Sequence, residues 1–199
     1  MYKTMNKLDL KNLIGKTDVI LEIGCADGTD TEGLMKWGTV YGFEPEPRSI
    51  RVLEQIPNLK LFKGAVSDID GTAIFNRSRT DDPKAVRLSG SIMKPKNHVK
   101  IWDWIFFDET IKVETIKLDT FCKDIPLIDF IWCDAQGAEG KIIKGGEETF
   151  RKTRYFLTEY QNDEHYDGQP TLDEILKLLP DFEIRMDYGT DVLLRNKTL

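Results

Sequence analysis

The sequence predicts an α/β fold with a mostly parallel central sheet and a C-terminal antiparallel hairpin. Over the first third of the chain, short apolar runs alternate with helix-forming stretches in the order β, α, β, α, β of a parallel sheet. The first apolar run stops at a group of glycines, as a strand does when it turns toward a ligand. Near the end, residues 182–186 and 192–195 flank the turn Tyr188-Gly189-Thr190 as the strands of a hairpin.

Length and composition fit one domain over residues 1–199. The chain has 199 residues, of which 40% are hydrophobic, and it contains no linker-like stretch or internal repeat. Its net charge of −6 disfavours a general nucleic-acid binder, whose affinity depends on neutralising phosphates. No apolar run has the length of a membrane span, and the polar, lysine-dotted start is unlike a signal peptide. We therefore expect a cytoplasmic protein without membrane contact.

The cysteines agree with that location. Cys25, Cys122 and Cys133 are odd in number and lack C-x-x-C spacing. We expect reduced thiols, and neither a disulfide framework nor a metal centre.

Local signals predict the elements of the first half. An apolar run makes the first strand, the residues after its glycine turn cap a helix, and Pro47 lies near the first position of the next helix. A short helix before the first strand covers one edge of the sheet. The predicted elements are helices over residues 8–13, 31–37 and 48–55, and strands over 19–23, 39–44 and 59–66.

The glycine turn and the end of the second strand predict an adenosine-containing ligand. Gly24, Ala26 and Gly28 let the backbone approach a ligand closely. Glu44 follows about 20 residues later, where nucleotide-binding α/β folds carry a ribose-binding carboxylate. A dinucleotide fingerprint requires G-x-G-x-x-G, which the chain lacks, and Glu22 suits a ligand ammonium better than a phosphate. The alternative is a structural turn without a ligand.

An insertion is predicted after the third strand, at about residues 67–110. Ala65 and Val66 come where an adenine edge would lie if Glu44 holds the ribose. The turn Asp70-Gly71 followed by a strand over residues 72–75 indicates a hairpin on the ligand side of the sheet.

Basic residues dominate the next segment, residues 77–100, where periodicity disappears. One interpretation is a solvated loop, and the other is a lid that attracts an anionic acceptor, with Ser89, Gly90 and Ser91 offering hydroxyls and amides. The basic residues are Arg77, Arg79, Lys84, Arg87, Lys94, Lys96 and Lys100.

An aromatic stretch follows at residues 101–107. It is typical of core or oligomer contacts, with a sugar-stacking platform as the alternative. Residues 112–118 then form a strand, and residues 119–123 form a short helix capped by Asp119.

Acids follow two more predicted strands in the second half. The strand over residues 128–133 delivers Asp134 to the carboxyl edge of the sheet, opposite the glycine turn, and Gly137 begins a turn into a helix over 138–150. The strand over residues 155–160 carries Glu159 to the same edge. Asp134 can contact a cofactor, a metal or the reacting group, and the alternative is a helix cap. A polar loop with His165 precedes a helix over residues 170–179, capped by Thr171.

These segments together resemble the FkbM-type methyltransferases over roughly residues 17–160. The resemblance lies in LEIGCADG, VYGFEPEP, GAVSDIDGTAIF, SGSI, TIKLDTF, FLTEY and above all IDFIWCDAQGAEGKIIKGG. It implies a Rossmann-like class I methyltransferase that uses S-adenosylmethionine and methylates sugar or small-molecule hydroxyls. By position, Glu22, Gly24 and Gly28 match the cofactor turn, Glu44 the ribose acid, and Asp134 and Glu139 the second block. Ala26, Trp132 and Cys133 depart from the usual residues.

The predicted site has two parts. Asp134, Glu159 and His165 are the candidate bases for the acceptor hydroxyl. No metal is needed, because a sulfonium leaves without one, although an ion held by Asp134, Glu159 and Asp163 is an alternative. The predicted cofactor-binding residues are Glu22, Gly24, Cys25, Ala26, Asp27, Gly28, Glu44, Pro45, Ala65, Val66 and Asp134.

Two other functions stay open at this point. A nucleic-acid methyltransferase acting on an RNA cap or ribose would explain the basic segment, but the N/D-P-P-[YFW] signature of amino-methylating enzymes is absent after Cys133. A non-catalytic domain that binds S-adenosylmethionine or a nucleotide would lose the acids of the second block, which this chain retains. We therefore expect a small-molecule or glycan acceptor, anionic if the basic segment recruits it.

Overall fold

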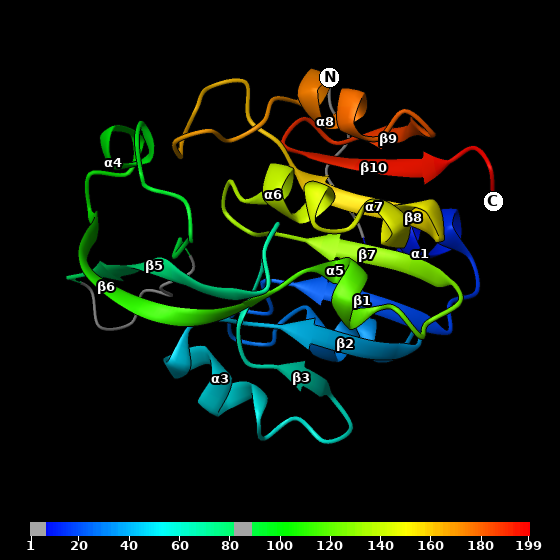
Figure 1. Cartoon of the computed structure of the whole chain (residues 1–199), viewed down its shortest axis with the longest axis horizontal. Coiled ribbons are helices and arrows are strands. Elements are labelled where there is room, and N and C mark those ends of the chain that lie inside the picture. Colours follow the sequence, from blue (N-terminus) through cyan, green and yellow to red (C-terminus); the bar gives the residue numbers. More distant parts are fainter. Residues whose placement is uncertain (1–6, 82–88) are drawn as a thin grey trace.

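The computed structural model describes residues 7–81 and 89–199. Its centre is a seven-stranded sheet with the strand order β3-β2-β1-β7-β8-β10-β9 (Figure 1). The first five strands in this order run parallel, and β10 runs antiparallel to both β8 and β9. This confirms the predicted fold. The strands are β1 (Val19–Ile23), β2 (Thr39–Phe43), β3 (Lys60–Phe62), β7 (Ile128–Cys133), β8 (Thr153–Glu159), β9 (Phe182–Asp187) and β10 (Asp191–Asn196).

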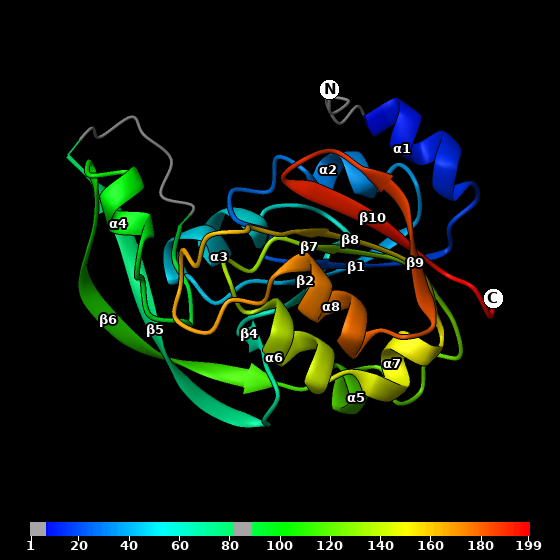
Figure 2. The same ribbon diagram turned by 90° about the horizontal axis from the view of Figure 1, so that it is seen from above.

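Helices cover both faces of this sheet (Figure 2). One face packs against α1 and α2, and the other against α5, α6, α7 and α8. Strand residues alternate between the two faces, so Ile20 joins the first core and Leu21 the second. All six residues of β7 are buried, because β7 lies in the middle of the sheet. The helices are α1 (Lys7–Ile14), α2 (Thr31–Leu34), α3 (Pro47–Leu53), α4 (His98–Ile101), α5 (Leu118–Phe121), α6 (Glu139–Lys144), α7 (Glu147–Arg151) and α8 (Leu172–Leu178).

The predicted third strand over residues 59–66 is wrong in extent, because it is two strands in two sheets. After β3 the chain crosses close to a neighbouring strand at Gly64, where a Cβ atom would lie 2.7 Å from the Glu114 carbonyl oxygen. β4 (Ala65–Val66) then pairs with β6 (Ile105–Ile116) in a second sheet of order β4-β6-β5.

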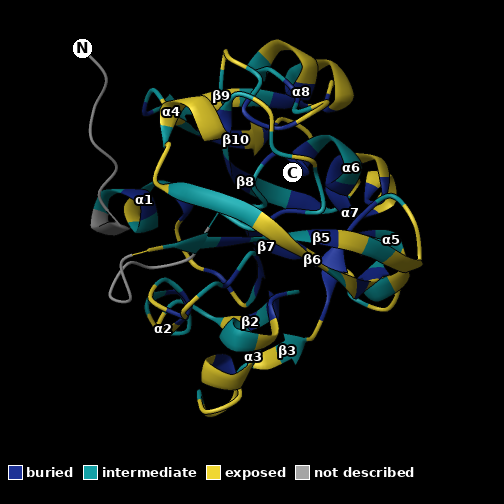
Figure 3. Ribbon diagram, turned by 90° about the vertical axis from the view of Figure 1, so that its left-hand side faces the viewer, coloured by how far each residue is buried: buried dark blue, intermediate teal, exposed yellow. Residues whose placement is uncertain are grey.

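The predicted hairpin at Asp70-Gly71 is also wrong. β5 (Gly71–Thr80) begins there, but its partner is the distant β6 and not the strand before the turn. Asp70 instead accepts hydrogen bonds from Lys117 N at 2.8 Å and Thr120 Oγ1 at 2.8 Å, which ties the turn to α5. β5 and β6 form an arm that projects on the carboxyl-edge side of the central sheet, and α4 near the tip of this arm is largely exposed (Figures 1 and 3).

The predicted helix over residues 138–150 is divided into α6 and α7. Gly145 ends α6 where the backbone presses on the insertion, because a Cβ atom there would lie 2.1 Å from the Ser67 carbonyl oxygen. Asp119 does not cap α5, whose N-cap residue is Lys117. The Asp119 carboxylate instead accepts hydrogen bonds from Glu148 N at 3.2 Å and from Thr149 N at 2.7 Å, in the first turn of α7.

Two smaller outcomes complete the fold. The predicted helix over residues 31–37 is regular only in α2. Thr171 caps α8, as predicted, in a reciprocal capping box with Glu174. None of the helices in the described part of the chain is long and apolar enough to cross a membrane.

Candidate functional site

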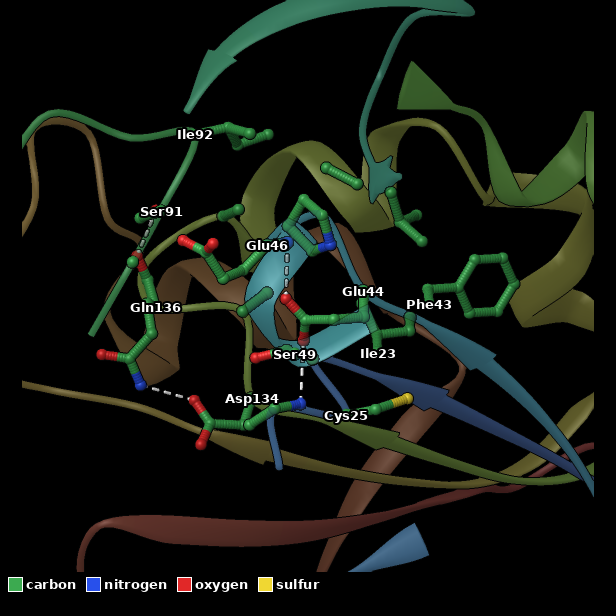
Figure 4. Close-up of a pocket in the computed structure, with 18 of the residues that line it drawn as sticks. Ile23, Cys25, Phe43, Glu44, Glu46, Ser49, Ser91, Ile92, Asp134 and Gln136 are labelled. Carbon is green, nitrogen blue, oxygen red and sulfur yellow. Dashed lines mark hydrogen bonds between the residues drawn. The ribbon is translucent and has the colours of Figure 1, made fainter. Parts of the chain in front are cut away.

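A cavity of about 260 Å³ lies at the carboxyl edge of the central sheet (Figure 4). Its floor comes from the ends of β1, β2 and β7, and its walls include β4, Phe75 of β5, residues 90–92, the turn after β1 and Ser49 of α3. The insertion therefore closes the site that the central sheet opens. The lining residues are Ile23, Gly24, Cys25, Ala26, Asp27, Thr29, Asp30, Phe43, Glu44, Pro45, Glu46, Ser49, Ala65, Val66, Phe75, Gly90, Ser91, Ile92, Trp132, Asp134, Ala135, Gln136 and Ala138.

The turn that follows β1 has left-handed backbone angles and a close backbone contact, so it favours glycine and alanine over larger residues. Gly24 has φ +88°, and a Cβ atom there would lie 2.0 Å from the Asp134 carbonyl oxygen. Ala26 also lies in the left-handed region, at φ 51°. Gly28 packs against the side chains of Leu53 and Ile56 and does not line the cavity.

Glu44 joins the end of β2 to this turn. Its Oε2 atom accepts from Ala26 N and its Oε1 atom from Glu46 N, both at 2.8 Å (Figure 4). Burial raises the pKa of Glu44 to about 7, although the two backbone N–H groups oppose that shift. A carboxylate has about four acceptor positions, so two remain for hydroxyl groups of a ligand.

Glu46 lines the cavity two residues after Glu44 and connects it to the second sheet, which contains β4, β5 and β6. It accepts two hydrogen bonds from the Arg77 guanidinium, at 2.7 and 2.9 Å, and Arg48 binds it from α3. Burial opposes ionisation of Glu46, but the two arginines outweigh burial and lower its pKa to about 2. Because Arg77 also binds Glu109 of β6 at 2.5 Å, one cation holds β5, β6 and the start of α3 together.

Three of the five basic residues that the structure describes in the segment 77–100 pair with acids. Besides Arg77, Arg79 pairs with Asp81 and Asp108, and Lys96 pairs with Glu164. Arg77 and Arg79 lie in β5, so the expected irregular segment begins after that strand. Lys84 and Arg87 lie outside the described residues.

Asp134 directly follows β7 and faces the cavity beside Gln136 (Figure 4). Gln136 Nε2 donates to Asp134 Oδ1 at 2.5 Å, and Gln136 Oε1 accepts from the Tyr166 hydroxyl at 3.0 Å. Ser91 Oγ donates to the Gln136 carbonyl oxygen at 2.7 Å, which fastens the cavity wall at residues 90–92 to the end of β7. The sequence predicted that Ser91 offers its hydroxyl to the acceptor substrate. In the structure this hydroxyl donates to the protein's own backbone.

Four carboxyl groups with raised pKa values lie at or near the carboxyl edge of the sheet: Asp134, Glu139, Glu159 and Asp191. Burial, followed by like charges, raises the pKa values of Asp134 to about 6, Glu139 to about 7 and Glu159 to about 9, and burial also raises the pKa of Asp191. Asp134 and Glu159 follow neighbouring residues of the β7–β8 pair, in which Cys133 lies opposite Thr158. Both groups are therefore easier to protonate than ordinary carboxyl groups, and the pKa of Glu159 is raised more than that of Asp134.

Four predicted site residues do not line the cavity: Glu22, Gly28, Glu159 and His165. Glu22 is buried in β1, on the same side of the strand as Ile20. The His165 ring packs edge-on against Trp102, with ring centroids 5.2 Å apart, and burial lowers its pKa. The structure thus gives His165 a packing role and does not bring it to the ligand side of Asp134.

Several lining residues were missed by sequence reasoning. Gln136 lies inside the block that contains Asp134 and Gly137, so its place beside a predicted acid was the available signal. Glu46 similarly follows Glu44 by two residues. Phe75 carried no local signal, since long-range packing alone brings it to the cavity, and the same is true of Tyr166, which contacts the lining residue Gln136 without lining the cavity itself.

The charge of the cavity favours a cationic ligand. Among its described lining residues are Asp27, Asp30, Glu44, Glu46 and Asp134, and none is Lys, Arg or His. Opposite charges attract strongly in such a partly dehydrated site. No group of three or more His, Cys, Asp or Glu side chains in the described ranges is arranged to hold a metal ion. An ion held by Asp134, Glu159 and Asp163 therefore gains no support.

Two sequence comparisons match this chain to methyltransferases. A profile described as the methyltransferase FkbM domain matches residues 22–188. The chain is 43% identical over 203 residues to the 2-O-methyltransferase NoeI of Sinorhizobium fredii (strain NGR234), covering 94% of this chain and 84% of the relative.

Solved structures agree at the level of the fold. An rRNA methylase from Streptococcus thermophilus matches with a TM-score of 0.52 at 12% identity, covering 98% of each chain. TehB from Haemophilus influenzae matches with a TM-score of 0.51 at 12% identity, covering 95% of this chain and 60% of TehB. Both are similar in fold alone.

Proposed function

Because the chain belongs to the FkbM-type family of S-adenosylmethionine-dependent methyltransferases, we propose that it transfers a methyl group to a hydroxyl group of a sugar. S-adenosylmethionine is the cofactor of this O-methyltransferase, and it supplies an electrophilic methyl group on a sulfonium. The observation that carries the proposal is Asp134, a carboxylate that lines the acidic cavity at the carboxyl edge of the central sheet.

The residues of the cavity fit the cofactor. The absence of a side chain at Gly24 lets the turn after β1 pack directly against the Asp134 carbonyl group, and Glu44 keeps acceptor positions for ribose hydroxyls. Ala65 and Val66 give an apolar wall for the adenine ring. The acidic lining suits a ligand with a sulfonium and an ammonium group.

Asp134 is the proposed general base. A hydroxyl group must lose its proton during or after attack on the methyl carbon, and a carboxylate with a pKa of about 6 is ionised at neutral pH and can take it. Glu159 is the weaker candidate because it does not line the cavity and because burial and like charges raise its pKa further. We propose that Glu159 acts on Asp134 only through their like-charge interaction, since Glu159 does not line the cavity.

The acceptor we propose is an uncharged sugar ring, methylated on a 2-hydroxyl. The position follows the name of the relative NoeI, a 2-O-methyltransferase. The cavity lining offers carboxylates and no described cation, and the arginines of β5 are bound to acids. An anionic acceptor, expected from the basic segment, therefore has less support than a neutral one. We keep the cytoplasm as the proposed location, since the three buried thiols suit a reducing compartment.

The test is transfer of tritiated methyl from S-adenosylmethionine to separate pools of neutral glycans, nucleotide sugars and capped RNA. We expect label in the neutral glycan pool, at an alkali-stable position typical of a methyl ether. Asp134→Asn keeps the shape of the side chain and should lower kcat by about 10² to 10⁴.

Two outcomes would contradict the proposal. Label in capped RNA alone would favour the nucleic-acid alternative. Full activity of Asp134→Asn would remove Asp134 as the base while leaving the family assignment intact.

A further inference from the structure

One side-chain amide connects Asp134 to a buried tyrosine. Gln136 Nε2 donates to Asp134 Oδ1, and the Tyr166 hydroxyl lies 3.0 Å from Gln136 Oε1 and 2.8 Å from the Ser89 carbonyl oxygen. A tyrosine hydroxyl has a single proton and so can satisfy only one of these two oxygens at a time. We call the side chains of Asp134, Gln136 and Tyr166, together with the Ser89 carbonyl group, the row. While Asp134 is ionised, the row contains two hydrogen bonds, and either Gln136 Oε1 or Ser89 O receives no proton from Tyr166.

A proton on Asp134 allows a different arrangement of the same atoms. If the Gln136 amide turns over, the Asp134 O–H donates to Gln136 Oε1, and Nε2 donates to the Tyr166 oxygen. The Tyr166 proton then points to Ser89 O. The row now contains three hydrogen bonds, one more than before, with no movement of the backbone. The protonated form of Asp134 is therefore the one that the row satisfies best.

We propose that Tyr166 is a positioning residue for methyl transfer, which acts through Gln136 to hold the proton that Asp134 takes from the acceptor hydroxyl. In that step the acceptor O–H bond breaks, its electron pair stays on oxygen and its proton moves to Asp134. The inference rests on the proposed role of Asp134 as the base.

Packing fixes the geometry that this role requires. Gln136 lies at φ 53°, and its carbonyl oxygen is held by Ser91 Oγ at 2.7 Å. The Tyr166 ring is buried against His98 and Phe107, with ring centroids 5.3 and 6.4 Å apart. At Gly137, a Cβ atom would lie 2.8 Å from Tyr166 Cβ, so the turn and the ring fit directly against each other. A supporting group that is locked in this way can control a neighbouring carboxylate precisely.

Other acids also favour a proton on Asp134, but none of them orients it. Like charges face Asp134 from five elements or their flanks: Asp30 before α2, Glu44 after β2, Glu139 of α6, Glu159 of β8 and Asp191 of β10. Their repulsion acts through space and is the same whichever way the Gln136 amide points. The effect of Tyr166 on Asp134 differs because it acts only through hydrogen bonds of the Gln136 side-chain amide.

Tyr166→Phe isolates this contribution because it removes only the hydroxyl. The ionised arrangement loses one hydrogen bond and the protonated arrangement loses two, so the pKa of Asp134 should fall by about half to one unit. The measurement is a pH titration of the full chain labelled with ¹³C at aspartate carboxyl carbons, with the Asp134 signal identified by its absence in Asp134→Asn. Tyr160→Phe is the matched control, since it loses a buried hydroxyl bond to Asp187 at 3.0 Å outside the cavity lining.

A double-mutant cycle tests the path through the amide. In a Gln136→Met background, Tyr166→Phe should cause no further shift, because the row is already broken. An unchanged or higher pKa in Tyr166→Phe would overturn the proposal, and so would an equal shift in the Gln136→Met background.

This titration needs no substrate, so it separates the two proposals. If Asp134→Asn keeps full methyl transfer, the proposed base fails whatever the titration gives. If Asp134→Asn is inactive and Tyr166→Phe leaves both the titration and the acid limb of the kcat/KM profile unmoved, only the role of Tyr166 fails. The expected result is an acid limb displaced to lower pH by the same half to one unit.

Discussion

The Glu44 carboxylate accepts a hydrogen bond from the backbone N–H of Ala26 at 2.8 Å. The carboxylate that follows β2 and the turn that follows β1 are thus parts of one structure, although 18 residues separate them. Ala26 lies at φ 51°, and this bond holds its N–H toward the cavity. Changes at Glu44 should therefore affect both ribose binding and the shape of the turn.

Glu44→Ala should weaken binding of S-adenosylmethionine at least tenfold. A hydrogen bond to a charged group contributes about 1.5 to 3 kcal/mol, and loss of the carboxylate removes the acceptors for the ribose hydroxyls. Isothermal titration calorimetry measures the change. Glu54→Ala is the control, because Glu54 pairs with Lys63 and does not line the cavity. Equal affinity of Glu44→Ala and wild type would sink the assignment.

Stability of the ligand-free protein should fall as pH rises from about 4.5 to about 9. Glu44 and Glu139 have pKa values of about 7 and Glu159 of about 9, all above the ordinary value of 4.5. Between those two values the folded state keeps a proton that the unfolded chain has released. Each group therefore stabilises the fold fully below pH 4.5 and loses that contribution progressively until pH exceeds its folded pKa. Unfolding curves at several pH values measure the slope.

Glu159→Gln should flatten the upper part of this decline, between about pH 7 and 9, since Glu159 is the group that titrates there. S-adenosylmethionine should restore stability most at high pH, where its positive charges meet ionised carboxylates. A slope unaffected by Glu159→Gln would show that other groups control it.

Local signals were sufficient to predict most of the central sheet. Apolar runs, the glycine turn and the capping residue Thr171 each depend on neighbours in sequence, and β1, β2, β7 and α8 appear where expected. Glu44 and Asp134 were likewise predictable, because parallel strands bring their carboxyl ends to one edge.

The insertion was harder to predict because its partners are distant in sequence. β5 pairs with β6 across more than 20 residues, and no local pattern could distinguish this pairing from a short hairpin. The divided helix has a similar cause, since Gly145 ends α6 by contact with Ser67, far back in the chain. The Tyr166–Gln136 contact depends on a loop whose course only the packed structure defines.

Gly145→Ala should lower the free energy of unfolding by about 1 to 3 kcal/mol. The new Cβ atom would lie 2.1 Å from the Ser67 carbonyl oxygen, so two backbone segments must move apart. Gly140→Ala is the matched control in the same helix, because its Cβ atom would meet Pro170 at an ordinary 3.6 Å and alanine favours helix by about 0.5 to 1 kcal/mol. Urea denaturation compares the two. Similar effects at both positions would contradict the close contact.

The KM for the acceptor should depend little on salt if that acceptor is an uncharged sugar. Lys94 is exposed in the segment predicted to recruit anions, and Lys94→Glu should leave both KM and its salt dependence unchanged. Long-range attraction would be screened between about 10 mM and 150 mM salt, as the Debye length falls from about 30 to about 8 Å. A KM that rises with salt, and rises again in Lys94→Glu, would favour the anionic acceptor. Arg87→Glu extends the test to the part of that segment outside the described residues.

Arg77→Met should destabilise the protein and also weaken cofactor binding. The Arg77 side chain is 15% exposed and holds both Glu46, which lines the cavity, and Glu109 of β6. Methionine keeps the apolar stem but leaves Glu46 with Arg48 as its remaining guanidinium partner among the described residues. Because a charge in a buried pair then lacks part of its compensation, we expect a loss of about 1 to 3 kcal/mol, together with a higher Kd for S-adenosylmethionine.

Arg79→Met is the comparison for this change, two residues along the same strand. Arg79 is 41% exposed, and its partners Asp81 and Asp108 are more exposed still, so water replaces the lost pairs and both stability and Kd should stay near wild type. Denaturation and calorimetry on the two variants therefore separate a structural connection from surface charge. If both arginines prove equally dispensable, the ion pairs of Glu46 do not hold the inserted sheet over the cavity, and the wall at residues 90–92 must depend on Ser91 and Gln136 instead.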